Sequence, residues 1–232
     1  MSACVYLIPS VLAEDATASI PAYVLQAIES CQVIFAENER TTRRFFKSLS
    51  KEIVIDNYEW FTIHKAEQEV LQAFKEKIKE GKNIAIVSEA GCPGIADPGQ
   101  VLIAAAQAMD VMVKPLVGPS SILLALMASG MNGQQFEFVG YLPIDSNERM
   151  KSIRELEAAS QKNNSTKIFI ETPYRNNQLL ETLLKTCNPS TRICVAAGLT
   201  SANEYIKTKT AAEWKKEKVE LHKKPVIFLL QG

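Results

Sequence analysis

The sequence predicts an α/β protein of two lobes: an N-terminal lobe with a mainly parallel, doubly wound sheet and a C-terminal α/β lobe with a mixed sheet. Two observations support this fold class. In the first half, short apolar runs alternate with amphipathic stretches of helical length, as in β-α units. After Gly130, strand-like runs follow one another as in hairpins. We place the boundary between Val117 and Gly118, which predicts lobes 1–117 and 118–232; one continuous sheet is the alternative.

The first lobe is expected to contain four pairs of a strand and a helix. Its strands are predicted in CVYLIP, QVIFAE, NIAIVSE and VMVKPLVG, with helices near residues 22–30, 40–49, 100–109 and 120–129. The strands of the second lobe are predicted in QFEFVGYLP, KIFIETP, TRICVAAGLT, SANEYIKTKT and KKPVIFLLQG, with helices near residues 146–162 and 178–187.

The composition is typical of a globular protein, because 47% of the 232 residues are hydrophobic and 22% are charged. Lys and Arg together number 26, as do Asp and Glu, so no overall field favours nucleic acid, although a local patch still can. The five cysteines form no CxxC pair, which disfavours a zinc knot and a disulfide framework. No apolar run reaches the roughly 18 residues that span a bilayer. We therefore expect a soluble, cytoplasmic protein with no membrane contact.

The segment 88–99 is the strongest candidate for a ligand-binding loop. Three glycines and two prolines fall within nine residues, between a predicted strand and a predicted helix. Such a βα turn lies beyond the carboxyl end of its strand, where backbone N–H groups can approach a ligand closely. Its length exceeds the usual two to six residues, although a plain connection is the alternative. The loop lacks the GxxxxGK[ST] pattern of a phosphate-binding P-loop.

The segment 117–121 again joins a strand to a helix. Ser120 or Ser121 can cap that helix, and capping alone would explain these serines. Two such turns after neighbouring parallel strands nevertheless enclose a crevice. The segment is therefore a second candidate for binding.

The segment 36–51 is basic. Five positive charges occur without an intervening acid, at Arg40, Arg43, Arg44, Lys47 and Lys51. A solvated helix face would explain them, but clustered arginines also suit a polyanion because guanidinium pairs bidentately with phosphate. Phe45 and Phe46 are expected to be exposed beside these charges. Glu37 and Glu39 precede them and can cap the helix, pair with a charge or act as a base.

The segment ETPYRNN, residues 171–177, ends a predicted strand. Pro173 stops the strand, and Asn176 or Asn177 can start the next helix. Glu171 and Arg175 are candidates for holding a substrate; a simple ion pair is the alternative. The two histidines, at positions 64 and 222, lie near no second metal ligand and in no triad pattern, so we predict no metal site.

These segments together resemble the tetrapyrrole methylase superfamily, the two-lobed S-adenosylmethionine-dependent methyltransferases. The closest likeness is to members that methylate a ribose 2′-hydroxyl of small-subunit ribosomal RNA. The segments that carry the resemblance are AENERTTRRFF, VSEAGCPGIADPG, VGPSSILLALMASG, FVGYLP and ETPYR, against family patterns such as AEDTRHTRRLL, VSDAGTPGISDPG, PGPSAAITALSASG, FEGFLP and ESPHR.

The resemblance implies a tetrapyrrole methylase fold with S-adenosylmethionine in a cleft between the lobes. It also implies a homodimer and ribosomal RNA as partner. The implied cofactor-binding residues are Pro9, Gly91, Cys92, Pro93, Ile95, Ser120, Ser121, Ile170, Ala197 and Pro225. The candidate catalytic residues are Glu37, Arg40, Glu171 and Arg175, and the candidate RNA-binding residues are Arg43, Arg44 and Lys47. The general base remains open among Glu37, Glu39 and Glu171.

Three segments depart from the family pattern. PSVLAED replaces PTPIGNL after the first strand and lacks its glycine. AAGLTSANEY replaces ARELTKxHEE and lacks its arginine, its lysine and its two adjacent acids. WFTIHKAEQE offers only a displaced His64 where the family has an HNE-like element. A methyltransferase for a small, tetrapyrrole-like acceptor and a non-catalytic protein that binds the cofactor therefore remain alternatives.

Overall fold

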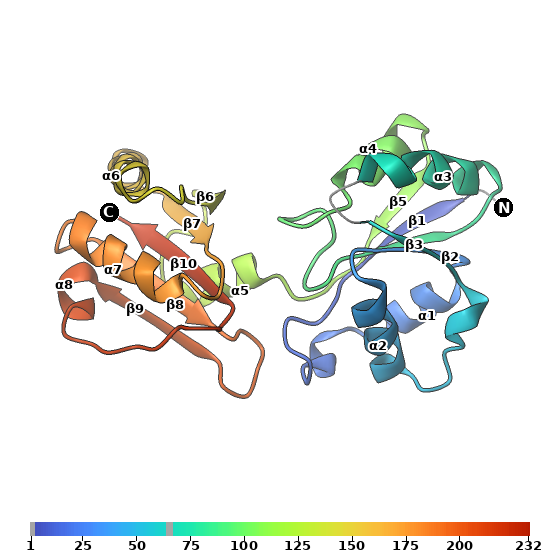
Figure 1. Cartoon of the computed structure of the whole chain (residues 1–232), viewed down its shortest axis with the longest axis horizontal. Helices are drawn as coiled ribbons and strands as arrows, with labels where there is room; N and C mark the ends of the chain where they lie inside the picture. The colour runs from blue at the N-terminus through green and yellow to red at the C-terminus, as the bar shows by residue number, and fades with distance from the viewer. Residues whose placement is uncertain (1–2, 64–66) are drawn as a thin grey trace. The chain divides into compact units, whose positions relative to one another are not determined.

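The computed structural model describes residues 3–63 and 67–232 of the chain (Figure 1). The chain divides into two compact units, Met1–Ser120 and Ser121–Gly232, each with its own sheet. One sheet is parallel and the other is mixed, so the predicted fold class is confirmed. The two separate sheets exclude the single continuous sheet. Within the described residues, no helix is long and apolar enough to cross a membrane.

The first unit contains a five-stranded sheet in the order β3-β2-β4-β1-β5, and all its neighbouring strands are parallel. The strands are β1 (Cys4–Ile8), β2 (Val33–Ala36), β3 (Glu59–Thr62), β4 (Ile84–Val87) and β5 (Met112–Pro115). The helices are α1 (Tyr23–Glu29), α2 (Glu39–Leu49), α3 (Glu67–Lys79) and α4 (Gln100–Ala108), with short 3-10 turns at Thr17–Ser19 and Ile55–Asn57.

The first sheet is covered by helices on both faces (Figure 1). Ile34 of β2 and Ala85 of β4 pack in the cluster that includes residues of α1 and α2. Their neighbours Phe35 and Ile86 point to the other face and pack with residues of α3 and α4. Because side chains alternate across a strand, central strands with two covered faces are apolar at every position. The doubly wound arrangement predicted for this lobe is therefore confirmed.

Strand β3 and helix α3 were not among the predicted elements. The apolar positions of α3 recur at helical spacing, and Val70, Leu71, Phe74 and Ile78 all belong to the core on that face. Only a short polar stretch precedes this helix, and His64 lies there, outside the described residues. The helical periodicity of residues 70–78 was the signal that the prediction missed.

The second unit contains a five-stranded sheet in the order β6-β7-β10-β8-β9. Only β6 and β7 pair in parallel; the other neighbours are antiparallel. The strands are β6 (Phe136–Tyr141), β7 (Thr166–Ile170), β8 (Arg192–Ala197), β9 (Tyr205–Thr210) and β10 (Val226–Gln231). The helices are α5 (Ser121–Ser129), α6 (Ser146–Asn163), α7 (Asn176–Thr186) and α8 (Ala211–Trp214).

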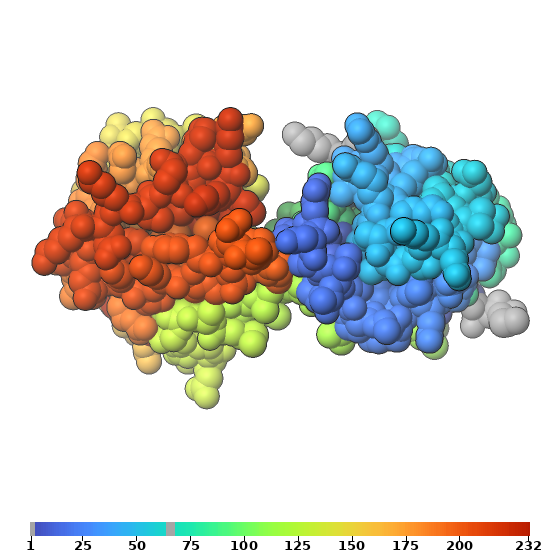
Figure 2. Space-filling view, turned by 90° about the horizontal axis from the view of Figure 1, so that it is seen from below, coloured from blue at the N-terminus to red at the C-terminus, as the bar shows by residue number. Residues whose placement is uncertain are grey.

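The core of the second unit is centred on aromatic side chains. Phe169 of β7 and Phe228 of β10 stack with ring centroids 6.0 Å apart, and Trp214 is buried in the same cluster. Trp214 also donates its indole N–H to the carbonyl oxygen of Ile193. Helix α5 packs against β8, β9 and β10 of this unit. It appears in yellow-green below the orange hairpin strands in Figure 2.

Candidate functional site

In the first sheet, the chain diverges after the neighbouring strands β1 and β4, which is the arrangement expected beside a ligand site. These strands are neighbours, but the chain leaves β1 toward α1 on one face and leaves β4 toward α4 on the other (Figure 1). Loops that diverge in this way form the crevice where ligands bind in open parallel sheets. Two backbone hydrogen bonds, Ser10 N to Gly91 O at 2.8 Å and Gly91 N to Ser10 O at 3.2 Å, join the two loops at this point.

The loop after β4 also lies against the loop after β5. The Cys92 thiol lies 3.6 Å from the carbonyl oxygen of Pro119. At Gly118 a methyl group would overlap the ring of Pro9, so only glycine allows this close approach of the loops after β1 and β5. Gly91, with φ of +72°, takes a left-handed conformation between the two neighbouring loops. Three loops predicted to bind the cofactor are thus brought together within the first unit.

The predicted residues of these loops differ in exposure. Pro9, Gly91 and Pro93 are buried, whereas Cys92 is half-buried and Ile95 is 54% exposed. Ser120 directly precedes α5, and Ser121 is its first residue. The Ile95 side chain is more than half exposed and belongs to neither of the two core clusters described for this unit. It is therefore available to an apolar part of a ligand.

Helix α2 carries the predicted basic segment. Asn38 caps it by accepting the Thr41 N–H at 3.1 Å, and Glu39 lies in its first turn, where negative charge is favourable. Phe45 and Phe46 are 4% and 0% exposed, so the prediction that they are exposed is wrong. They form the apolar face of α2 and pack on the sheet, because a helix next to a core turns one stripe of its surface inward.

The basic residues of α2 fall into two groups. Arg43 pairs with Glu39 at 2.5 Å, and its guanidinium lies 5.0 Å from the ring centroid of Trp60. Arg40, Arg44 and Lys47 are exposed. The Lys47 ammonium donates to the carbonyl oxygen of residue 51 at 2.9 Å, at the end of the helix. Of the residues that the structure describes, none forms an ion pair with Arg44.

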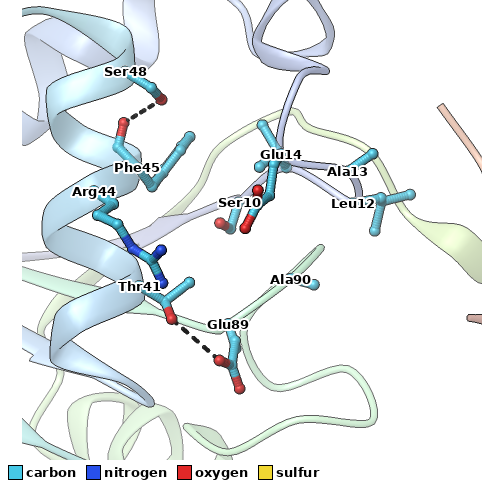
Figure 3. A pocket seen from close by; sticks show the side chains of 11 residues that line it. Ser10, Leu12, Ala13, Glu14, Thr41, Arg44, Phe45, Ser48, Glu89 and Ala90 are labelled. Atoms are coloured by element: carbon cyan, nitrogen blue, oxygen red, sulfur yellow. Dashed lines mark hydrogen bonds between the residues drawn. The ribbon is translucent and has the colours of Figure 1, made fainter. Parts of the chain in front are cut away.

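A pocket of about 290 Å³ lies where α2 faces the loops after β1 and β4 (Figure 3). We call it the Arg44–Glu89 pocket. Its lining residues are Ser10, Val11, Leu12, Ala13, Glu14, Thr41, Arg44, Phe45, Ser48, Glu89 and Ala90. Its wall therefore combines a guanidinium, two carboxylates, hydroxyl groups and apolar side chains.

The Glu89 side chain is held on the pocket wall by two hydrogen bonds. Its Oε1 accepts a hydrogen bond from Thr41 Oγ1 at 3.2 Å (Figure 3) and another from Asn38 Nδ2, also at 3.2 Å. Its backbone N–H donates to Glu37 Oε2 at 2.7 Å. Glu37, a predicted catalytic residue, thus anchors the start of the loop after β4. Sequence reasoning missed Glu89, although this residue lies within the conspicuous segment VSEAGCPGIADPG.

Carboxylates gather at this end of the sheet. Burial and the negative charges of Glu37 and Glu89 raise the pKa of Asp97 to about 7. No group of three or more His, Cys, Asp and Glu side chains is placed to hold a metal ion, as far as the structure describes the chain.

In the second unit, Glu171 and Arg175 form the predicted pair. Arg175 donates to Glu171 Oε1 through Nη2 at 2.7 Å and through Nε at 3.0 Å, and the Thr172 N–H donates to the same oxygen at 2.6 Å. The Glu171 side chain is only 1% exposed. This pair orders the turn between β7 and α7. Helix α7 begins at Asn176, one of the two asparagines predicted to start it.

Three residues that the resemblance assigned to adenosine lie together at one end of the second sheet. Ile170 is opposite Ile227, and Ala197 is opposite Val226, on the two strands that flank β10. Pro225 directly precedes β10, and its carbonyl oxygen accepts the Gly198 N–H at 3.0 Å. Because β10 is antiparallel to both neighbours, its beginning meets their ends.

Comparison with known proteins identifies the family. Residues 15–215 match the model of the Tetrapyrrole (Corrin/Porphyrin) Methylases, which is most of the chain. The chain belongs to this family. The protein is therefore a methyltransferase, in agreement with the resemblance noted in its loops.

Two relatives match this methylase over nearly its whole length. Ribosomal RNA small subunit methyltransferase I of Escherichia coli O157:H7 is 29% identical over 231 residues, covering 98% of this chain and 77% of that protein. The enzyme of the same name from Vibrio cholerae is 29% identical over 233 residues, covering 98% and 76%.

Solved structures with the same fold are more distant in sequence. The crystal structure of the methyltransferase CobJ has a TM-score of 0.65 and 17% identity, covering 100% of this chain and 94% of that one. Uroporphyrin-III-C-methyltransferase from Thermus thermophilus has a TM-score of 0.59 and 14% identity, covering 98% and 94%. At such identities these structures support the fold alone.

Proposed function

We propose that this methylase transfers a methyl group from S-adenosylmethionine to a ribose 2′-hydroxyl of small-subunit ribosomal RNA. The observation that carries the proposal is the likeness, over 98% of the chain, to proteins named ribosomal RNA small subunit methyltransferase I. The exposed arginines and lysine of α2 support it, because guanidinium and ammonium groups neutralise phosphate.

The residues of the first unit fit a cofactor of this kind. The loops after β1, β4 and β5 meet at Gly91, whose φ of +72° disfavours any side chain, and at Gly118, where a methyl group would overlap the Pro9 ring. Pro9, Gly91, Cys92, Pro93, Ile95, Ser120 and Ser121 would hold the methionine part, and Ile170, Ala197 and Pro225 the adenosine. S-adenosylmethionine supplies an electrophilic methyl group on a positively charged sulfur.

The protein's main task is then to position the acceptor. Alignment of two reactants can contribute about 7 to 11 kcal/mol, and a base that removes the hydroxyl proton adds about a hundredfold or more. Glu37 fixes the loop after β4 through the Glu89 N–H, so we assign it a positioning role. Glu171 and Arg175 order their turn in the same way. The exposed Arg40, Arg44 and Lys47 would contact RNA phosphates, whereas Arg43 is held by Glu39 and Trp60.

A small tetrapyrrole-like acceptor is the competing substrate, since CobJ and a uroporphyrin methyltransferase share this fold. The two substrates differ in how salt affects binding. Phosphate contacts release counterions, so affinity for RNA should fall steeply as salt rises. A small acceptor has no condensed counterion layer to release, even when it carries carboxylates, so its affinity should fall less steeply with salt. The homodimer and the cytoplasmic location remain predictions.

The decisive experiment compares ribosomal RNA from the wild-type strain and a deletion strain by mass spectrometry of ribonuclease fragments. We expect one small-subunit fragment to lose a methyl group on deletion and to regain it when purified protein and S-adenosylmethionine are added to small subunits. Unchanged ribosomal RNA would exclude the proposal. Calorimetry with S-adenosylmethionine is the control, because a protein that does not bind it can have only a non-catalytic role.

A further inference from the structure

We propose that the Arg44–Glu89 pocket binds a single nucleotide of an RNA strand, the one whose ribose accepts the methyl group. The inference rests on the proposed function and specifies where the acceptor lies. Neither the family match nor the relatives assign a ligand to this pocket.

The positive charge of the pocket is available to an anion. Arg44 is exposed and forms no ion pair with any residue in 3–63 or 67–232. Arg43, one position before it, is instead held by Glu39 and Trp60. A guanidinium without a partner can bind a phosphate through two parallel hydrogen bonds. Arg44 is therefore suited to the phosphate of a nucleotide.

The opposite wall offers acceptors for hydroxyl groups. Thr41 and Asn38 hold Glu89 through Oε1, and among the described residues no donor occupies Oε2. Figure 3 shows Arg44 and Thr41 extending from α2, with Glu89 on the loop that faces them. A carboxylate so fixed can accept a hydrogen bond from a ribose hydroxyl. A ligand that suits both Arg44 and Glu89 would carry an anionic group and free hydroxyl groups, and a ribonucleotide has both.

The size of the pocket suits one nucleotide. About 290 Å³ is at the lower end of small-molecule sites, which makes it too small to enclose a tetrapyrrole. The apolar lining by Leu12 and Ala13 offers contact for a base. Enzymes that modify nucleotides in folded nucleic acid commonly take one residue out of the stack into such a pocket, and single-stranded bases are the usual targets in RNA.

The pocket also adjoins the loop proposed to hold the cofactor. Ala90 lines the pocket, and the next residue, Gly91, is hydrogen-bonded to Ser10 on the pocket's other loop. Cys92 then contacts Pro119 on the loop after β5. One short segment thus borders the acceptor pocket at residues 89 and 90 and the cofactor loops from residue 91 onward.

The test measures binding of the four ribonucleoside 5′-monophosphates and their 2′-deoxy counterparts to the full chain by NMR titration. Backbone amide signals of Leu12, Glu89 and Ala90 should shift on binding. Arg44→Ala should weaken binding about tenfold, the value expected for one charge-assisted phosphate contact of about 1.4 kcal/mol. Lys51→Ala is the matched control, since it removes the same charge beyond the end of α2, outside the pocket; it should weaken binding less than about twofold.

A second variant tests the hydroxyl contact. Glu89→Ala should abolish the preference for ribonucleotides over deoxyribonucleotides, while leaving the phosphate contribution intact. Equal effects of Arg44→Ala and Lys51→Ala, or shifts confined to other residues, would overturn the inference. If the Arg44→Ala protein methylates ribosomal RNA as fast as the wild type, the assignment of the acceptor nucleotide to this pocket is refuted, while the proposed function is sustained. Nucleotide binding in the pocket without methylation would refute the proposed function instead.

Discussion

Two arginines, one in each unit, differ in what holds them. Arg175 in the second unit makes two hydrogen bonds to Glu171, whose side chain is 1% exposed. Arg44 in the first unit is exposed on a pocket wall, and the Glu89 carboxylate across the pocket is held by other groups. A paired, buried charge stabilises a turn, whereas an unpaired charge is available to a ligand. Function in this protein should therefore depend on Arg44, and stability on Arg175.

The largest expected effect is the difference in unfolding free energy between alanine variants of these two arginines. Arg175→Ala should lower the free energy of unfolding by about 3 kcal/mol, because it leaves the buried Glu171 carboxylate without its charge partner. Arg44→Ala should change it by less than about 0.5 kcal/mol, as expected for an exposed side chain. Chemical denaturation followed by circular dichroism measures both. Equal losses would remove the distinction between a structural and a ligand-binding arginine.

The next largest effect on stability is expected at a glycine of the first unit, compared with a glycine of the second unit. Gly118→Ala should cost about 2 kcal/mol, because the added methyl group would overlap the Pro9 ring and force the loops after β1 and β5 apart. It should also weaken binding of S-adenosylmethionine in calorimetry. Gly133→Ala in the second unit is the control, since its added methyl group meets no atom within 4 Å. A fully stable Gly118→Ala protein would show that the loops adjust freely.

The smallest effect concerns the pH dependence of the carboxylates in the first unit. The pKa of Asp97 is about 7 in the folded protein and 3.8 ordinarily, so the folded state holds the proton more tightly between these values. The contribution of Asp97 to stability should thus fall as pH rises from about 4 to about 7, and stay low above.

Asp97→Asn removes this titration and tests its sign. The variant should melt at a higher temperature than the wild type at about pH 8, and at the same temperature at about pH 4. Because Asp97 is half-buried and screened by solvent, the gain should stay under about 1 kcal/mol. A gain that is larger at about pH 4 than at about pH 8 would contradict a raised pKa.

Much of the fold could be predicted from the sequence because its signals are local. Alternating apolar runs and amphipathic stretches indicated the first sheet, and consecutive strand-like runs indicated the second. Asn176 or Asn177 was expected to start the helix α7, which begins at Asn176. The wrong predictions also came from short segments of the sequence. Phe45 and Phe46 were expected to be exposed because charges surround them, but the helix turns them to the core. Helix α3 was missed although its apolar residues recur at helical spacing.

The candidate site, like the fold, was predictable from the sequence where it depends on short segments. The sequence alone identified the glycine-rich loop, the basic helix and the methylase family, because these depend on residue types in short segments. It also allowed for the Glu171–Arg175 ion pair, whose members are four residues apart. Only the tertiary structure joined Glu89 to Thr41, 48 residues away in the chain, and left Arg44 on α2 without an ion-pair partner among the described residues. Such contacts depend on the order of strands in the sheet. That order cannot be inferred from the residue types of a short segment, because it is set by which strands pair after the whole chain folds.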